Sequence, residues 1–336
     1  MTQNLENKSG IELGVLPTHR KFVGGVAPGD GGKLPRTAEG ELVMIEELKA
    51  LVAQSSVKIN STGISYFPGT DADDVAELMA GIEALDLEPQ TVLMVGGANP
   101  WDPADEDAVV EQLVSGLHTA KKYGVKTVAS TSFEEWMSGR PTLEGADYEN
   151  AVTQLAKVHH RAYTEAEVAG SSITCWNLEF LRTGEFTTFT SIAKAAPVAT
   201  ATNALLGSTV MQLMVDAAHC GDSGLTLAEN EALIAELAER NEFGIFHASA
   251  KTTRGCLSTD DGWIPALMTA AAKTGKLKDV HVEVFHHEDE ALQALRDLVP
   301  GHGVDTTDGR TYTQVVIDGI IDVTHRLNNL KARGIL

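Results

Sequence analysis

The segment SSITCWNLE, residues 171–179, is a short, largely apolar run with an acidic side chain at its end, and three later segments likewise carry an acidic residue or a histidine at or near the end. They are VMQLMVD at 210–216, FGIFH at 243–247 and VHVEVF at 280–285. Short apolar runs rich in β-branched and aromatic residues are typical of buried strands. Because longer segments with helical spacing separate them, this half of the chain predicts strand–helix units that build a parallel sheet.

The same alternation extends over the whole chain. We predict strands at Ile11–Leu16, Val57–Thr62, Thr91–Val95, Thr127–Ser130, Ser171–Leu178, Val210–Val215, Phe243–Phe246 and Val280–Phe285. We predict helices at Glu39–Ala53, Asp71–Leu85, Pro103–Tyr123, Ala146–Ala169, Ser191–Leu206, Thr226–Glu239, Asp261–Thr274 and Glu288–Leu298. Asp102 is the expected N-cap of the third helix, with Pro103 at its first position. Thr226 and Glu229 have the spacing of a capping box.

Eight such units favour an α/β fold of the (β/α)8 TIM-barrel type over an open sheet. No GxGxxG motif follows the first strand, which argues against dinucleotide binding. A chain of 336 residues suits one barrel domain over 1–336, with a flexible N-terminus at 1–10. The C-terminal extension, 301–336, carries an extra helix at Tyr312–Ala332 that we expect to cap the barrel outside or to contact a neighbouring subunit.

Composition narrows the functional classes. The net charge of −21 disfavours nucleic acid as a partner. Three cysteines, Cys175, Cys220 and Cys256, form no CxxC pair and favour a reducing compartment. The polar N-terminus has no apolar leader, and no apolar run of about 18 residues is present. We therefore expect a cytoplasmic protein with no membrane partner.

Polar side chains end four consecutive predicted strands: Glu179, Asp216, His247 and Glu283. Chemistry in this fold gathers at the carboxyl ends of the strands. A lone acid after a strand is usually a helix cap or a solvated loop residue, but four adjacent strands with such residues favour a shared site. Oxygen ligands with one imidazole suit a divalent metal such as Mn²⁺, Mg²⁺ or Co²⁺, with Zn²⁺ as an alternative.

The order Glu, Asp, His, Glu resembles the xylose isomerase-like barrel superfamily. Within it, the ketose 3-epimerases (tagatose/psicose epimerase-like) and rhamnose isomerase-like sugar isomerases are most similar, over about 172–289. The resemblance implies that the four residues bind a divalent metal, most often Mn²⁺, and that Glu179 and Glu283 are the catalytic carboxylates. It also implies substrate binding by Glu185, His219 and Arg254. The segment HASAKTTRGCLSTDDGW, 247–263, departs in part from the family pattern and leaves the substrate open.

Two further positions are candidates from their place in the chain. Trp101 follows the third strand and could offer an apolar wall to a sugar ring. His19 and Arg20 follow the first strand and could line the mouth of the barrel.

These residues predict a metal-dependent sugar isomerase or epimerase that moves a proton at the carbon next to a carbonyl through a metal-bound enediolate. A lyase or dehydratase on a sugar-derived keto compound could use the same site. An endonuclease IV-like nuclease is disfavoured by the few histidines at the early strand ends and by the negative charge. A non-catalytic binding barrel is a further alternative, and a homo-oligomer is an expectation by analogy.

Overall fold

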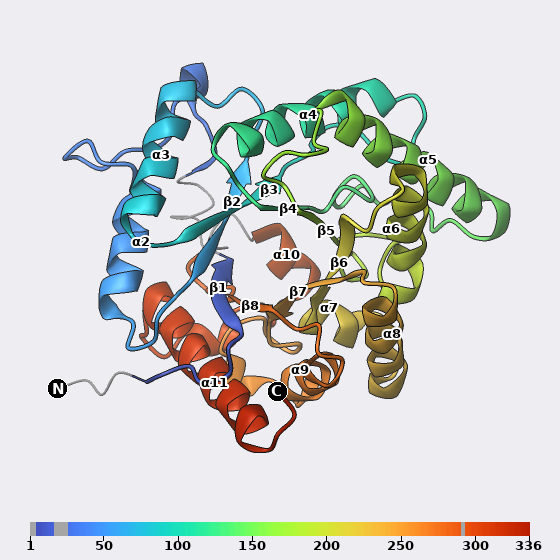
Figure 1. The fold of residues 1–336 in the computed structure, drawn as a ribbon. Coiled ribbons are helices and arrows are strands. Elements are labelled where there is room, and N and C mark those ends of the chain that lie inside the picture. Colours follow the sequence, from blue (N-terminus) through green and yellow to red (C-terminus); the bar gives the residue numbers. More distant parts are fainter. Residues whose placement is uncertain (1–4, 17–25, 290–292) are drawn as a thin grey trace.

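The computed structural model describes residues 5–16, 26–289 and 293–336. Eight parallel strands form a closed barrel in sequence order, and helices surround it (Figure 1). The strands are β1 (Glu12–Leu16), β2 (Ser61–Tyr66), β3 (Glu88–Leu93), β4 (Thr127–Ser130), β5 (Cys175–Glu179), β6 (Met211–Asp216), β7 (Phe243–Ala248) and β8 (Asp279–Glu283). Pairing of β1 with β8 closes the barrel, so the TIM-barrel prediction is confirmed.

Helices follow the strands in the predicted alternation. They are α2 (Val43–Gln54), α3 (Ala72–Ala84), α4 (Glu106–Lys122), α5 (Gly145–Glu165), α6 (Ile192–Leu206), α7 (Ala217–Asp222), α8 (Leu227–Glu239), α9 (Trp263–Lys273), α10 (Gln293–Leu298) and α11 (Tyr312–Ala332). Three short 3₁₀ turns are η1 (Asp30–Gly32), η2 (Leu257–Thr259) and η4 (Val304–Thr306). The capping box of Thr226 and Glu229 is present at the start of α8.

Some predicted boundaries are wrong, for local reasons. The second strand begins at Ser61 because Asn60 is used to hold β1: its side chain accepts from Leu13 N at 3.0 Å and its N–H donates to Leu13 O at 2.7 Å. The helix α4 begins at Glu106 after an N-cap at Asp105, and not after Asp102, which accepts from Ala104 N within the preceding turn. The short helix α7 was not predicted, because six residues are too few to show helical periodicity.

Side chains fill the barrel below the carboxyl ends of its strands. A small apolar cluster of Ala129, Met214 and Ile245 forms one part of this packing. At Gly14, a Cβ atom would lie only 2.4 Å from the His281 ring, so the interior admits no side chain on β1 at this level. The ring of His281 in turn stacks on His247 at a centroid distance of 5.9 Å. This interior is a packed core that supports the strand ends above it.

The C-terminal helix α11 is part of the barrel wall and is not an extra element. It packs on β8 between α9 and α2, and Gly319 allows the backbone to approach Val282 (Figure 1). The additional elements are α10 and η4, in the connection between β8 and α11. Near the N-terminus, two hydrogen bonds join the chain to Asn328 in α11. Lys8 N donates to Asn328 Oδ1, and Asn328 Nδ2 donates to Glu6 O. Within the described ranges, no helix is long and apolar enough to cross a membrane.

Candidate metal centre

The four predicted ligands lie together at the carboxyl ends of the strands. Glu179, Asp216 and Glu283 are the last residues of β5, β6 and β8, and His247 lies one residue before the end of β7. One ligand atom from each lies within 4.8 Å of those from the other three. All four side chains belong to residues that are at most 8% exposed. Parallel neighbouring strands therefore bring together residues that are about 100 positions apart in the sequence.

The donor atoms of this cluster fit a cation. Asp216 Oδ2 and both ring nitrogens of His247 are buried and have no hydrogen-bond partner. Carboxylate oxygens surround His247 Nδ1: Glu179 Oε1 lies at 3.2 Å and Glu283 Oε2 at 3.5 Å. Buried polar atoms without partners are rare in folded proteins, and a metal ion satisfies them.

Burial and the charges of neighbouring side chains shift the pKa values of the clustered residues. Burial lowers the pKa of His247, but the carboxylates of Glu179 and Glu283 outweigh it and raise the pKa to about 10. Burial raises the pKa of Asp216 well above its usual value, against the effect of Arg254. For Glu283, the Arg254 guanidinium and His247 outweigh burial and hold the pKa well below its usual range. A cation would replace the proton that these carboxylates hold on the imidazole.

Arg254 extends from the loop after β7 into the cluster. Its guanidinium lies 2.8 Å from Glu283 Oε2 and 3.5 Å from Glu185 Oε2, and the residue is 1% exposed. The guanidinium also lies over the Phe285 ring, 4.2 Å from its centroid. Arg254 thus joins a predicted metal ligand to a predicted substrate-binding residue.

His219 is held in the first turn of α7, directly after Asp216. Asp216 Oδ1 accepts from His219 N at 2.7 Å, so one carboxylate oxygen caps the helix while the other faces the cluster. The Nδ1 atom of His219 accepts the backbone N–H of Arg182 at 3.1 Å, and Nε2 lies 3.7 Å from Glu179 Oε1. Burial and Arg254 lower the pKa of His219 well below its usual value, so the ring is neutral with its proton on Nε2.

Glu185 lies in the loop after β5, buried beside two arginines. Burial raises its pKa, against the attraction of Arg254. Trp136, which the sequence did not single out, donates from Nε1 to Glu185 Oε1 at 3.2 Å while its side chain stays 47% exposed. An exposed tryptophan that is hydrogen-bonded to a site residue offers an aromatic surface against which a ligand can pack. Arg182 was also missed: it is buried, 3.3 Å from Asp222 and 3.2 Å from His302 Nε2.

Comparisons with known proteins agree on this architecture. No family model matches the chain, and no curated protein matches it. Among solved structures, an L-ribulose 3-epimerase superposes with a TM-score of 0.71 at 17% identity, over 96% of this chain and 97% of that one. D-psicose 3-epimerase of Clostridium cellulolyticum H10, solved with D-tagatose, gives 0.67 at 12% identity over 94% and 99%. The IolI protein, solved with a zinc atom, gives 0.58 at 13% identity over 95% and 96%. These structures share the fold of this chain, a closed barrel of eight parallel strands.

In this barrel, the predicted site residues do not all meet. Glu185, His219 and Arg254 lie against the cluster. The described contacts of Trp101 are with Arg140 and the hydrophobic core, and not with the cluster. The Arg140 guanidinium lies 5.4 Å from the centroid of the Trp101 ring, and the indole is partly buried against the core. The other candidates near the first strand, His19 and Arg20, fall outside the described residues.

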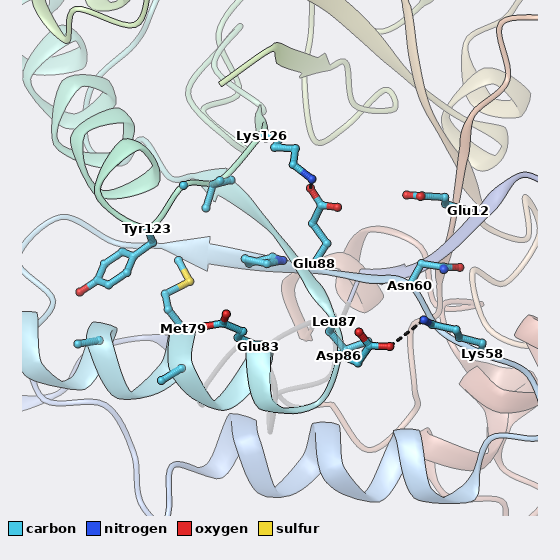
Figure 2. Close-up of a pocket in the computed structure, with 15 residues that line it drawn as sticks. Glu12, Lys58, Asn60, Met79, Glu83, Asp86, Leu87, Glu88, Tyr123 and Lys126 are labelled. Atoms are coloured by element: carbon cyan, nitrogen blue, oxygen red, sulfur yellow. Dashed lines mark hydrogen bonds and ion pairs between the residues drawn. The ribbon is translucent and has the colours of Figure 1, made fainter. Parts of the chain in front are cut away.

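A cavity of about 570 Å³ lies at the opposite end of the barrel (Figure 2). Its walls include residues at the amino ends of the strands, such as Glu12 and Glu88. Both of its lysines are paired with carboxylates of the same cavity: Lys58 lies 2.7 Å from Asp86, and Lys126 lies 3.0 Å from Glu88. In TIM barrels this end contributes stability, so the buried cluster at the carboxyl ends is the better functional candidate.

Proposed function

We propose that this chain is a divalent-metal-dependent sugar isomerase or epimerase. The observation that carries the proposal is the buried group of Glu179, Asp216, His247 and Glu283, whose ligand atoms lie within 4.8 Å of one another. The likeness to structures of ketose 3-epimerases, one of them solved with D-tagatose, supports a carbohydrate substrate. Function rests on the site here, because a TIM barrel by itself hosts many reactions.

The four side chains would hold the cation, with Mn²⁺ as the first candidate and Mg²⁺, Co²⁺ or Zn²⁺ as alternatives. Three carboxylates and one imidazole are a donor set for a hard or borderline divalent ion. When bound, such an ion supplies Lewis acidity, which makes a proton next to a carbonyl easier to remove.

Two carboxylates are placed to move the proton. Glu179 and Glu283 end β5 and β8, on different sides of His247, which lies 3.2 Å from Glu179 and 3.5 Å from Glu283. The lowered pKa of Glu283 keeps it in the ionised form that a general base requires. Removal by one carboxylate and return by the other inverts a carbon centre, and return to the adjacent carbon interconverts aldose and ketose.

The remaining residues bind and orient the sugar. The proton on His219 Nε2 can be donated to an oxygen that gains negative charge during the reaction. Arg254 can bind the same oxygen or a hydroxyl group, and Glu185 beside it can bind a hydroxyl. Trp136 offers an aromatic face at the exposed side of Glu185, and a substrate-binding role for Trp101 stays a prediction.

Deuterium exchange tests the proposal. We would incubate EDTA-stripped protein with and without Mn²⁺, Mg²⁺ or Co²⁺ in D₂O against a panel of ketoses and aldoses, and follow deuterium at the carbon next to the carbonyl by NMR. We expect metal-dependent exchange in the wild type and in a Glu236→Gln control on exposed helix α8. Glu179→Gln and Glu283→Gln should abolish it.

The labelled carbon distinguishes the outcomes. Label with inversion at the same carbon identifies an epimerase, and label at the adjacent carbon identifies an isomerase. Loss of a β-substituent from the sugar, detected as a dehydrated product, would assign the site to a lyase instead. No exchange with any sugar in a metal-loaded sample would contradict the isomerase proposal.

A further inference from the structure

Arg254 has a backbone conformation that the rest of the structure must maintain. Its φ is +51°, in the left-handed region that residues other than glycine seldom adopt. Such residues persist where surrounding contacts over-determine them, and they cluster at functional sites. One such contact is direct, because Phe285 N donates to Arg254 O at 2.6 Å.

Asp305 in η4 binds the chain on both sides of Arg254. Its Oδ2 atom accepts from Thr253 Oγ1 at 2.9 Å and from Cys256 N at 2.9 Å. The same oxygen accepts from Thr259 Oγ1 at 2.6 Å. A single carboxylate oxygen therefore gathers three donors, and two of them belong to residues within two positions of Arg254.

The fit between η4 and this loop is close. A Cβ atom on Gly255 would lie 1.9 Å from Asp305 Oδ1, so the loop can approach the carboxylate only because residue 255 is glycine. A second bond joins the same two segments, since Gly303 N donates to Thr253 O at 2.7 Å. The loop after β7 is thus held by the insertion between β8 and α11, which lies outside the strand–helix repeat.

We propose that Asp305 is a positioning residue that fixes Arg254 against Glu283 and Glu185. This inference rests on the proposed function, in which Arg254 binds the sugar. Asp305 acts on the loop backbone and on two threonine hydroxyls, and its described bonds do not include the four metal ligands. It therefore sets the place of the guanidinium without taking part in metal binding.

The first test measures sugar turnover in single and double variants. We expect Asp305→Ala to lower kcat/KM about 10- to 100-fold, as removal of supporting hydrogen bonds does in other sites. Asp305→Asn, which keeps an acceptor oxygen, should lose less than Asp305→Ala. Asp297→Ala, an exposed carboxylate on α10, is the matched control and should behave as wild type. Affinity for Mn²⁺, measured by calorimetry on stripped protein, should fall less than kcat/KM does in the two Asp305 variants, because Asp305 reaches Glu283 only through Arg254, and it should stay unchanged in Asp297→Ala.

The decisive comparison is made in an Arg254→Ala background. If Asp305 acts through Arg254, adding Asp305→Ala there changes kcat/KM less than twofold. An undiminished second loss, or full activity of the single variant, would overturn the proposal.

A readout without substrate separates this inference from the proposed function. We would measure amide hydrogen exchange of segment 250–259 in the same variants. Faster exchange in Asp305→Ala but not in Asp297→Ala supports the positioning role even if no sugar is turned over, whereas equal exchange in both overturns it. A wild type that is inactive on every sugar contradicts only the proposed function.

Discussion

The backbone N–H of Arg182 donates to His219 Nδ1 at 3.1 Å, and this bond decides which ring nitrogen of His219 carries the proton. Because Nδ1 accepts and the buried ring is neutral, Nε2 is the donor. The donor faces Glu179, with 3.7 Å between Nε2 and Oε1. A backbone group thus leaves His219 with the donor that the proposed function assigns to a substrate oxygen.

Replacement of His219 by an aliphatic side chain should therefore affect turnover and not metal binding. We expect His219→Leu to lower kcat about 100-fold, the usual loss when one donor to a developing anion is removed. The Kd for Mn²⁺ should stay within about threefold, because the bond from His219 to Asp216 is made by the backbone N–H and survives the substitution. His118→Leu, on the exposed face of α4, is the control. A large loss of metal affinity with unchanged kcat would assign His219 to the metal instead.

The sequence predicted the barrel and the group of four polar residues at its rim because both follow from local pattern. Glu179, Asp216 and Glu283 each end an apolar run, and parallel strands place such ends at one rim. Trp136 and Asp305 could not be predicted in this way. Each reaches the site through a loop contact with a residue about 50 positions away, Glu185 and Cys256 respectively, and no periodicity encodes such contacts.

Gly14→Ala should weaken metal binding although Gly14 contacts no metal. The new Cβ would lie 2.4 Å from the His281 ring and 2.5 Å from Ser61 Oγ, and His281 stacks on the ligand His247. We expect a destabilisation of about 1–3 kcal/mol, as overpacking typically causes. The Kd for Mn²⁺ should rise about tenfold because the ligand ring is displaced.

Calorimetry and thermal unfolding on stripped protein would measure the two effects. Gly96→Ala is the matched control, since its Cβ would meet no atom within 4 Å. Equal metal affinity in Gly14→Ala and wild type would show that His281 does not hold the ligand in place.

Asp279 gives the barrel a pH-dependent stability at its amino end. Asp279 and Glu12 are register partners of β8 and β1. Burial, with the adjacent Glu12 carboxylate, raises the pKa of Asp279 from 3.8 to about 6. Between these values the folded state binds more protons than the unfolded state, so the free energy of unfolding falls as pH rises from about 4 to 6.

Asp279→Asn removes the free-energy cost of ionising this buried carboxyl group. We expect it to stabilise the protein by about 1–2 kcal/mol at pH 8, after allowance for the partial exposure of the group, and to have little effect at pH 4. Urea unfolding at the two pH values would measure the difference. Asp261→Asn, at an exposed loop position, is the control. A stabilisation of equal size at both pH values would mean that charge on Asp279 is not its cause.

Two variants of Trp136 would separate the contribution of its aromatic face to sugar binding from that of its hydrogen bond to Glu185. Its indole is 47% exposed, and its Nε1 donates to Glu185 Oε1 at 3.2 Å. Trp136→Phe keeps an aromatic face but loses the bond, whereas Trp136→Ala loses both. If the ring packs against the sugar, we expect KM to rise about tenfold in Trp136→Ala and only two- to threefold in Trp136→Phe, because burial of an aromatic face is worth about 1 kcal/mol beyond that of a single exposed bond.

The value of kcat should change little in either variant, since the indole contacts no group that moves a proton. Leu205→Ala, which removes an exposed apolar side chain at the end of α6, controls for general surface effects. Equal rises in KM for the two tryptophan variants would assign the whole effect to the bond with Glu185. A fall in kcat instead would mean that Trp136 orients Glu185 during the reaction, because loss of a uniform binding contact raises KM alone.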